Sequence, residues 1–184
     1  MSSKADVNHK SKVALHLSDL LIRKVEQYDL QALEWDGEFK KYRRMYADIF
    51  RDSRIGKTLM WIIETPSRDL LGQVFVMLDS SEKEAADGES RAYIFAFRVK
   101  DNWRNRGVGT YLMQFVENDC RQRGFSYLTL NVAKENLAAR RLYERLGYQA
   151  IGSRPGRWSF KDDLGRIQHV HEPSWRMIKR ISAD

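Results

Sequence analysis

The stretch Arg104-Asn105-Arg106-Gly107-Val108-Gly109-Thr110 decides the fold, because it joins an apolar, strand-like segment to an amphipathic helix. Gly107 and Gly109 carry no Cβ atom, so another backbone or a ligand can approach the chain closely here. At a helix start several backbone N–H groups point toward one place, and the helix dipole adds positive potential there. The stretch therefore predicts an anion-binding turn, and a phosphate suits it best.

Apolar periodicity on both sides of this turn predicts an α/β domain with one central sheet. Before the turn we expect a strand at 20–25, helices at 28–35 and 38–53, and strands at 59–63, 70–78 and 91–99. After it we expect a helix to about residue 123, a strand at 125–132, a helix at 136–146, and strands at 148–153 and 169–178. The middle strands are apolar on both faces, which is typical of a covered sheet. The acidic segment 79–90 is expected to be an exposed loop.

Composition and charge indicate one globular domain in a reducing compartment. Of the 184 residues, 42% are hydrophobic and 31% charged, which is ordinary for a soluble protein with a sizeable core. A single cysteine, Cys120, excludes an internal disulfide framework, and no apolar run approaches the ~20 residues that span a bilayer. The amino-terminal segment lacks the apolar core of a signal peptide, so we expect a cytoplasmic protein without a membrane segment. The net charge of +7 comes from scattered arginines, which does not favour nucleic acid as the main partner.

Three phosphate-binding patterns compete for the glycine turn, and two of them fail. A dinucleotide-binding turn needs a third glycine where this chain has Leu112, and an acid on the next strand, which here carries Asn131. A P-loop needs a glycine where this chain has Arg51, and a helix after Gly56-Lys57-Thr58, where a strand is predicted. The third pattern is a Gln or Arg, with Gly three residues later and Gly or Ala two residues beyond it.

Arg104, Gly107 and Gly109 match that third pattern, and a second segment extends it. Asn136 to Tyr148 reads N-x-x-A-x-x-L-Y-x-x-x-G-Y. With these two segments in order, the chain resembles the GNAT superfamily of acetyl-CoA-dependent N-acetyltransferases. The resemblance covers about residues 20–181 and implies a single domain there, after an amino-terminal extension at 1–19. It also implies an α/β fold with a central, mixed, mostly antiparallel seven-stranded sheet flanked by about four helices.

The resemblance implies a site for acetyl-CoA as co-substrate. It assigns strand backbone that binds the pantetheine arm to Phe97, Arg98 and Val99. It assigns the backbone cradle of the pyrophosphate to Asn105, Arg106, Gly107, Val108, Gly109 and Thr110. The side chains of Arg104 and Arg106 add charge to this cradle, and Asn136 bonds the pantetheine near the thioester.

The family's chemistry is direct attack of an amine on the thioester, without an acyl-enzyme, which leaves no nucleophilic role for Cys120. Cys120 is expected to be a buried structural thiol. Tyr143 matches the family's general acid, and a phenol can protonate the leaving thiolate. Some members carry a glutamate base where this chain has Asn131, which can only position a water. Glu64 and Glu172 are the substitute bases that we expect to test first.

The acceptor is a primary amine, on either a small molecule or a protein. The family places it between the first two helices and the closing strands, where this chain has Trp35, Asp36, Glu38, Tyr42, Trp158, His169, His171, Glu172 and Trp175. His169 and His171 share one strand face but have no third ligand nearby in sequence, so we expect no metal site. Homodimers are common in the family. A non-catalytic acyl-CoA-binding sensor or scaffold stays open as the second function class.

Overall fold

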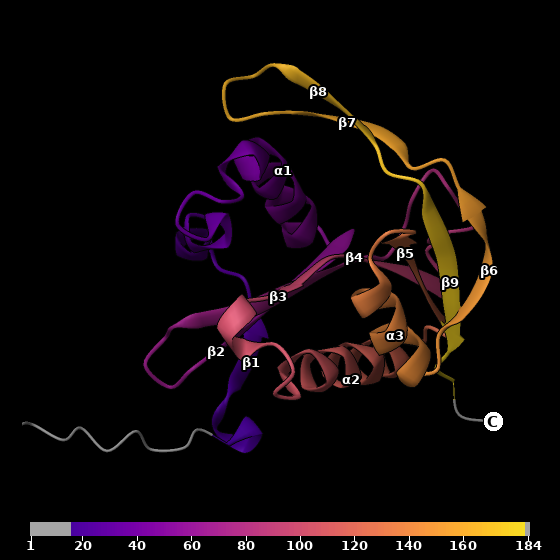
Figure 1. Ribbon diagram of the computed structural model, residues 1–184, viewed down its shortest axis with the longest axis horizontal. Coiled ribbons are helices and arrows are strands. Elements are labelled where there is room, and N and C mark those ends of the chain that lie inside the picture. Colours follow the sequence, from indigo (N-terminus) through magenta and orange to yellow (C-terminus); the bar gives the residue numbers. More distant parts are fainter. Residues whose placement is uncertain (1–15, 183–184) are drawn as a thin grey trace, which may run out of the picture.

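A seven-stranded mixed sheet forms the centre of the protein, in the order β1-β2-β3-β4-β5-β9-β6 (Figure 1). The structure is a computed structural model that describes residues 16–182. The strands are β1 (Leu21–Lys24), β2 (Thr58–Glu64), β3 (Leu70–Met77), β4 (Arg91–Val99), β5 (Tyr127–Ala133), β6 (Gln149–Arg154) and β9 (Ser174–Arg180). Only β4 and β5, among these neighbours, run parallel. This confirms the predicted mostly antiparallel seven-stranded sheet.

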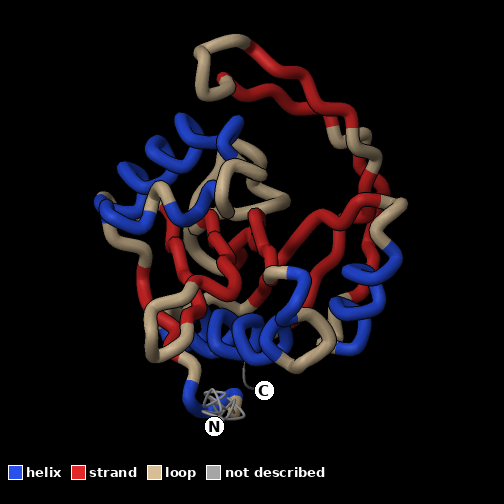
Figure 2. The backbone as a smooth tube through the Cα atoms, turned by 60° about the vertical axis from the view of Figure 1, so that its left-hand side comes forward, coloured by secondary structure: helices blue, strands red, loops and turns tan. Residues whose placement is uncertain are grey.

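Helices cover both faces of the sheet (Figures 1 and 2). The α-helix α1 (Arg43–Arg54) lies on one face, and α2 (Val108–Gln122) lies on the other with α3 (Leu137–Arg145) beside it. β2 is buried along its whole length, and its side chains alternate between the two cores. Trp61 and Ile63 join the core beneath α2, whereas Met60 and Ile62 join the core beneath α1. Within residues 16–182, no helix has the length and apolar character needed to cross a membrane.

The segment before α1 is helical in short turns rather than one helix. Three 3-10 turns occur, η2 (Gln27–Asp29), η3 (Ala32–Glu34) and η4 (Lys40–Tyr42). Trp35 and Asp36 have φ angles of 48° and 58°, and left-handed backbone ends a right-handed helix at that point. The predicted helix at 28–35 is therefore broken into turns, and α1 starts only at Arg43. Of the expected extension at 1–19, Leu17–Asp19 forms the 3-10 turn η1, and residues 1–15 lie outside the described part.

A separate hairpin of β7 (Arg157–Lys161) and β8 (Ile167–His171) was not predicted. The expected strand at 169–178 is wrong, because it is two strands, β8 and β9, separated by Glu172 and Pro173. Pro173 has no N–H for a ladder hydrogen bond, so pairing is interrupted there. The hairpin arches away from the sheet toward α1 (Figure 1). His169 and His171 therefore lie on this hairpin and not on the central sheet.

The acidic segment 79–90 is folded back onto the sheet, so the expectation of a wholly exposed loop is wrong. Ala85 and Ala86 are buried. The hydroxyl of Thr129 on β5 donates to the carbonyl of Ala85 at 2.7 Å. Glu82 accepts a hydrogen bond from Arg176 on β9 at 2.9 Å. Two small residues and one ion pair thus anchor a segment whose overall polarity suggested solvent exposure.

β4 contains one extra residue relative to β3. Gln73 pairs with Arg98, but Phe75 pairs with Phe95, so the register shifts by one across this interval. Ala96 takes a left-handed φ of 50° within the shift. An extra residue of this kind is a β-bulge, which bends its strand and increases the local twist. It lies at the point where β4 leaves its other neighbour, β5.

Candidate functional site

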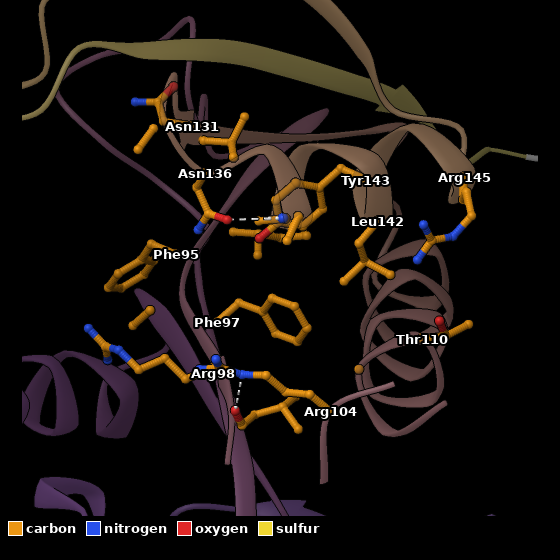
Figure 3. Close-up of a pocket in the computed structure, with 18 of the residues that line it drawn as sticks. Phe95, Phe97, Arg98, Arg104, Thr110, Asn131, Asn136, Leu142, Tyr143 and Arg145 are labelled. Atoms are coloured by element: carbon orange, nitrogen blue, oxygen red, sulfur yellow. Dashed lines mark hydrogen bonds between the residues drawn. The ribbon is translucent and has the colours of Figure 1, made fainter. Parts of the chain in front are cut away.

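A cleft opens where the parallel strands β4 and β5 separate. Their register runs from Arg91↔Tyr127 to Ile94↔Leu130 and ends there. Beyond that pair, Phe95–Val99 and Asn131–Ala133 line a cavity of about 780 Å³ (Figure 3). The edge of β4 that faces the cleft is thus free of a strand partner among the described residues. An extended ligand can use such an edge as an added strand does.

The cleft has two sides, because the two faces of β4 look toward different helices. Phe97 packs against the core beneath α2, whereas Phe95 packs against the core beneath α1. We call the part lined by Phe97, the glycine turn and α3 the α2 side. The part lined by Phe39, Phe95 and Arg98 is the α1 side.

Most of the predicted site residues line this one cleft. They are Phe97, Arg98, Val99, Arg104, Asn105, Gly107, Gly109, Thr110, Asn131, Asn136 and Tyr143. Arg106 and Val108 are not among the lining residues. Val108 is 1% exposed and belongs to the core, and Arg106 lies over the Trp103 ring at 5.4 Å. Their expected part in a phosphate cradle is therefore limited to their backbone.

The glycine turn begins α2 with two glycines that serve different purposes. Gly107 is the N-cap residue and has a left-handed φ of 82°. At Gly109 a Cβ atom would lie 3.2 Å from Cζ of Phe97, which is tighter than an ordinary contact. Gly107 therefore permits the turn, and Gly109 permits close packing against β4.

The first turn of α2 fits an anion. The first N–H groups of an α-helix have no acceptor within the helix, and the helix dipole adds positive potential there. Thr110 and Arg145 lie together at this end of the cleft, far from Arg98 (Figure 3). Arg104 donates from Nε to the carbonyl of Val99 at 3.0 Å, so its position beside the turn is fixed. These donors match the pyrophosphate that the resemblance implies.

Asn136 and Tyr143 bring α3 to the cleft. The Oδ1 atom of Asn136 accepts the N–H of Ala139 at 3.0 Å and caps the helix. Its amide nitrogen remains to donate to a ligand. Tyr143 is 7% exposed, with its ring centre 6.2 Å from that of Phe97 and 5.9 Å from that of Tyr148. Burial, with a smaller contribution from Tyr93, raises the pKa of Tyr143 well above its ordinary value, so the phenol stays protonated.

Asn131 is held by an arginine that sequence reasoning missed. Arg176, 1% exposed, donates from Nε to Oδ1 of Asn131 at 2.6 Å and from Nη2 to Glu82 at 2.9 Å. One lone pair of the Asn131 oxygen is therefore used by Arg176, and its amide nitrogen donates to no acceptor among the described residues. The signal in the sequence was an arginine inside the apolar run from Trp175 to Ile178.

The two proposed bases lie in different places. Glu64 is buried at the end of β2, where Arg23 and Arg68 bind its oxygens at 2.9–3.0 Å, and it does not line the cleft. Glu172, exposed between β8 and β9, does line the cleft. Burial raises the pKa of the Cys120 thiol to about 12, in keeping with a structural thiol.

Aromatic rings of the segment just before α1 contact the β7–β8 hairpin. The Tyr42 ring lies 6.4 Å from Trp158 and 4.8 Å from Phe160, and Phe39 lies 6.3 Å from Tyr42. Of the residues expected around an acceptor, Glu172 lines the cleft, and Phe39 lines it without having been predicted. In the described part of the chain, no group of three or more His, Cys, Asp or Glu side chains is arranged to hold a metal ion.

Comparison with known families gives one match over more than half of the chain. A model of the acetyltransferase (GNAT) family matches residues 25–148. A curated relative, the uncharacterized N-acetyltransferase YycN of Bacillus subtilis, is 24% identical over 90 residues. The match covers 49% of this chain and 54% of that protein, so the chain spans about half the length of this relative.

Solved structures share the fold at low sequence identity. A spermidine/spermine N-acetyltransferase from Vibrio cholerae has a TM-score of 0.67 at 17% identity, covering 90% of this chain and 94% of that one. Ard1 from Thermoplasma volcanium also gives 0.67 at 17% identity, with 88% and 97% covered. The ribosomal-protein-S18-alanine N-acetyltransferase from Escherichia coli gives 0.63 at 19% identity, with 90% and 96% covered. At these identities the likeness is one of fold.

Proposed function

The chain belongs to the GNAT family of acetyltransferases, and on that premise we propose that it transfers an acetyl group from acetyl-CoA to a primary amine. One observation carries the proposal. A single cleft brings the Gly107–Gly109 turn, Asn136 and Tyr143 together beside the unpaired edge of β4. These are the positions to which the two sequence segments assign the co-substrate. Acetyl-CoA supplies an activated thioester to this cleft.

The α2 side of the cleft is proposed to bind the co-substrate. The N–H groups that start α2, with Thr110 beside them, are donors for the pyrophosphate. The β4 edge at Phe97 and Val99 can pair with the amide groups of the pantetheine arm. The fixed side chain of Asn136 offers an amide donor to the same arm. Most of the hydrogen bonds proposed for acetyl-CoA come from backbone groups, so few charged side chains are needed on the α2 side.

Tyr143 is proposed to protonate the leaving thiolate. Tyr143 lines the cleft, and its raised pKa keeps the proton in place until a strong acceptor forms. The same low-dielectric site also raises the pKa of the leaving thiol, so the thiolate is a stronger base there than in water. The proton affinities of the thiolate and the Tyr143 phenolate are therefore raised together. The phenolate that results is then reprotonated from solvent.

The amine is proposed to enter from the α1 side and to lose its proton to Glu172 or to a water chain. Glu172 has an exposed carboxylate that lines the cleft, whereas the oxygens of Glu64 are held by two arginines away from it. Deprotonating an α-amine at pH 7 costs only about 1 kcal/mol, against roughly 4–5 kcal/mol for a lysine-like amine. A low-pKa amine therefore needs little help from a base.

The proposal is tested by two measurements on the purified full chain. Calorimetry measures acetyl-CoA binding, and thiol release is followed while a panel of primary amines is offered, with mass analysis of each product. We expect tight binding and release that depends on the amine, with one acetyl group added per thiol. Binding without amine-dependent release across the panel would instead favour a non-catalytic acyl-CoA sensor. Failure to bind acetyl-CoA would overturn both.

A further inference from the structure

Arg98 is a half-buried cation in the cleft without a carboxylate partner. It lies on β4, on the α1 side, and its Nη1 atom donates to the hydroxyl of Tyr46 at 3.0 Å. In residues 16–182, no Asp or Glu side chain forms an ion pair with Arg98, although several other arginines of this chain have such a partner. Tyr46 is fully buried, which raises the pKa of its hydroxyl, so this partner is neutral.

Three other arginines near the two cores are paired with acids. Arg23 is paired with Asp29 at 2.6 Å, Arg43 with Glu34 at 2.6 Å and Arg176 with Glu82 at 2.9 Å. A cation removed from water without an opposite charge is costly, and proteins pair such groups. Arg98 lines the cleft and has no such acid among the described residues, so an anion bound in the cleft can supply its counter-charge.

Two aromatic rings lie against the Arg98 guanidinium. Its central carbon lies 4.2 Å from the ring centre of Phe39 and 5.6 Å from that of Tyr42. A guanidinium carries five N–H donors, and only one of them has a hydrogen-bond acceptor in the described residues. A planar, oriented set of free donors suits a planar anion, above all a carboxylate, which can accept two parallel hydrogen bonds.

The position of Arg98 assigns this anion to the acceptor and not to acetyl-CoA. Arg98 extends away from Thr110 and Arg145, which lie at the glycine-turn end of the cleft (Figure 3). Its surroundings are Phe39 and Tyr42, next to the hairpin that arches toward α1. Among the described residues that line the cleft, Glu172 is the acidic one, and its carboxylate suits an ammonium.

We propose that the acceptor carries both a primary amine and a carboxylate, as an amino acid does, with the carboxylate bound by Arg98. The proposal deepens the acetyltransferase function and rests on it. Contacts of Tyr42 with Trp158 and Phe160 connect η4 to the hairpin next to the α1 side of the cleft.

The test uses matched pairs of acceptors that differ only in the anion. Initial rates of thiol release are measured for L-amino acids and for their α-amides, with spermidine and a short neutral peptide as further arms. Removing the carboxylate lowers the pKa of the neighbouring amine, so intrinsic reactivity favours the amides. We expect the opposite order, with kcat/KM for the acids higher by about 10- to 100-fold, the range of a charged hydrogen bond.

Three variants separate anion binding by Arg98 from its structural hydrogen bond to Tyr46 on α1. Arg98→Met should abolish the preference for acids, and Arg98→Lys, which keeps the charge but not the planar donors, should retain part of it. Arg51→Met is the matched control, because Arg51 is an exposed arginine on α1 that pairs only with its neighbour Asp48. It should leave the preference unchanged. Thermal unfolding of each variant shows whether the fold is retained.

A second readout does not depend on turnover. Calorimetry compares the binding of N-acetylalanine with that of N-acetylalaninamide, each with the wild type and with Arg98→Lys. Selective, Arg98-dependent binding of the acid without any acetylation would keep the anion site and refute the acetyltransferase. Amides, spermidine or the peptide reacting as well as the acids in the wild type would overturn the anion site and leave the acetyltransferase intact.

Discussion

The two sides of the cleft hold their residues in place by different means. On the α2 side, the backbone of a glycine turn and the closely packed residues Phe97, Tyr143 and Tyr148 define the site. On the α1 side, side chains from η4, β4 and the β7–β8 hairpin meet through ring contacts such as Tyr42–Trp158. The first arrangement suits a ligand that is always the same, and the second suits one that differs between proteins. Substitutions should therefore affect co-substrate use on one side and acceptor use on the other.

Tyr143→Phe should give the largest effect. It removes the proposed acid but keeps the ring packing, so turnover should fall by about 100-fold or more, the range of general acid catalysis. The dissociation constant of acetyl-CoA, measured by calorimetry, should stay within a factor of about 2. Tyr28→Phe, at an exposed tyrosine, is the control and should behave as the wild type. A variant with normal turnover would remove Tyr143 from the chemistry.

Gly107→Ala should weaken acetyl-CoA binding. A left-handed backbone costs an alanine about 1–2 kcal/mol, so without ligand the turn should move to another conformation. Binding must then restore the left-handed conformation, and the dissociation constant should rise about 5- to 30-fold. Gly124 also has a left-handed φ, of 94°, with open space around it and no contact with the cleft. Gly124→Ala should cost similar thermal stability without weakening binding. Equal weakening in both variants would mean that the turn has no special part in binding.

Trp158→Ala tests the α1 side. Loss of its stacking on Tyr42 should raise the KM for the acceptor by about 2- to 12-fold, the value of one aromatic pair. Acetyl-CoA binding should not change, because the ring contacts of Trp158 are with Tyr42 and Phe160 and not with residues of the α2 side. Leu164→Ala, at an exposed position in the loop of the same hairpin, is the control. An effect confined to acetyl-CoA would contradict the division into two sides.

Acid should loosen the β7–β8 hairpin by a smaller amount. Burial opposes ionisation of Asp162, but hydrogen bonds from the Arg166 backbone and the Gln168 side chain outweigh it and lower the pKa of Asp162 to about 2. The stabilisation is complete above about pH 4 and is lost as the pH falls through about 2.

The measurement is hydrogen-exchange protection of the Leu164 and Arg166 amides, which donate to Asp162 at 3.0 and 2.9 Å. Protection, corrected for the intrinsic pH dependence of exchange, should fall a few-fold between pH 4 and 2. In Asp162→Asn this fall should be absent, since the amide does not titrate. The same fall in the variant would assign it to other groups.

Sequence reasoning reached the α2 side of the site and much of the fold. The Gly107–Gly109 turn and the segment from Asn136 to Tyr148 are each short and local, so their residue types define their geometry. The α1 side depends on contacts between distant parts of the chain, such as Phe39 with Arg98 and Tyr42 with Phe160. Local periodicity carries no signal of such contacts. The β7–β8 hairpin is local, but its strands are largely exposed and have no long apolar run, so they were missed.

Ala96 has a consequence for how this chain is aligned with others. Ala92 and Ile94 share the core beneath α2, and so do Phe97 and Val99, so the even-numbered positions before the bulge correspond to odd-numbered ones after it. If the same residues ran through β4 without the bulge, Arg98 would lie on the opposite face of the sheet. An alignment that assumes strict alternation through the whole of β4 will therefore exchange the positions that face α1 with those that face α2 beyond Ala96. Acceptor-side residues are best compared between family members by counting from the carboxyl end of β4.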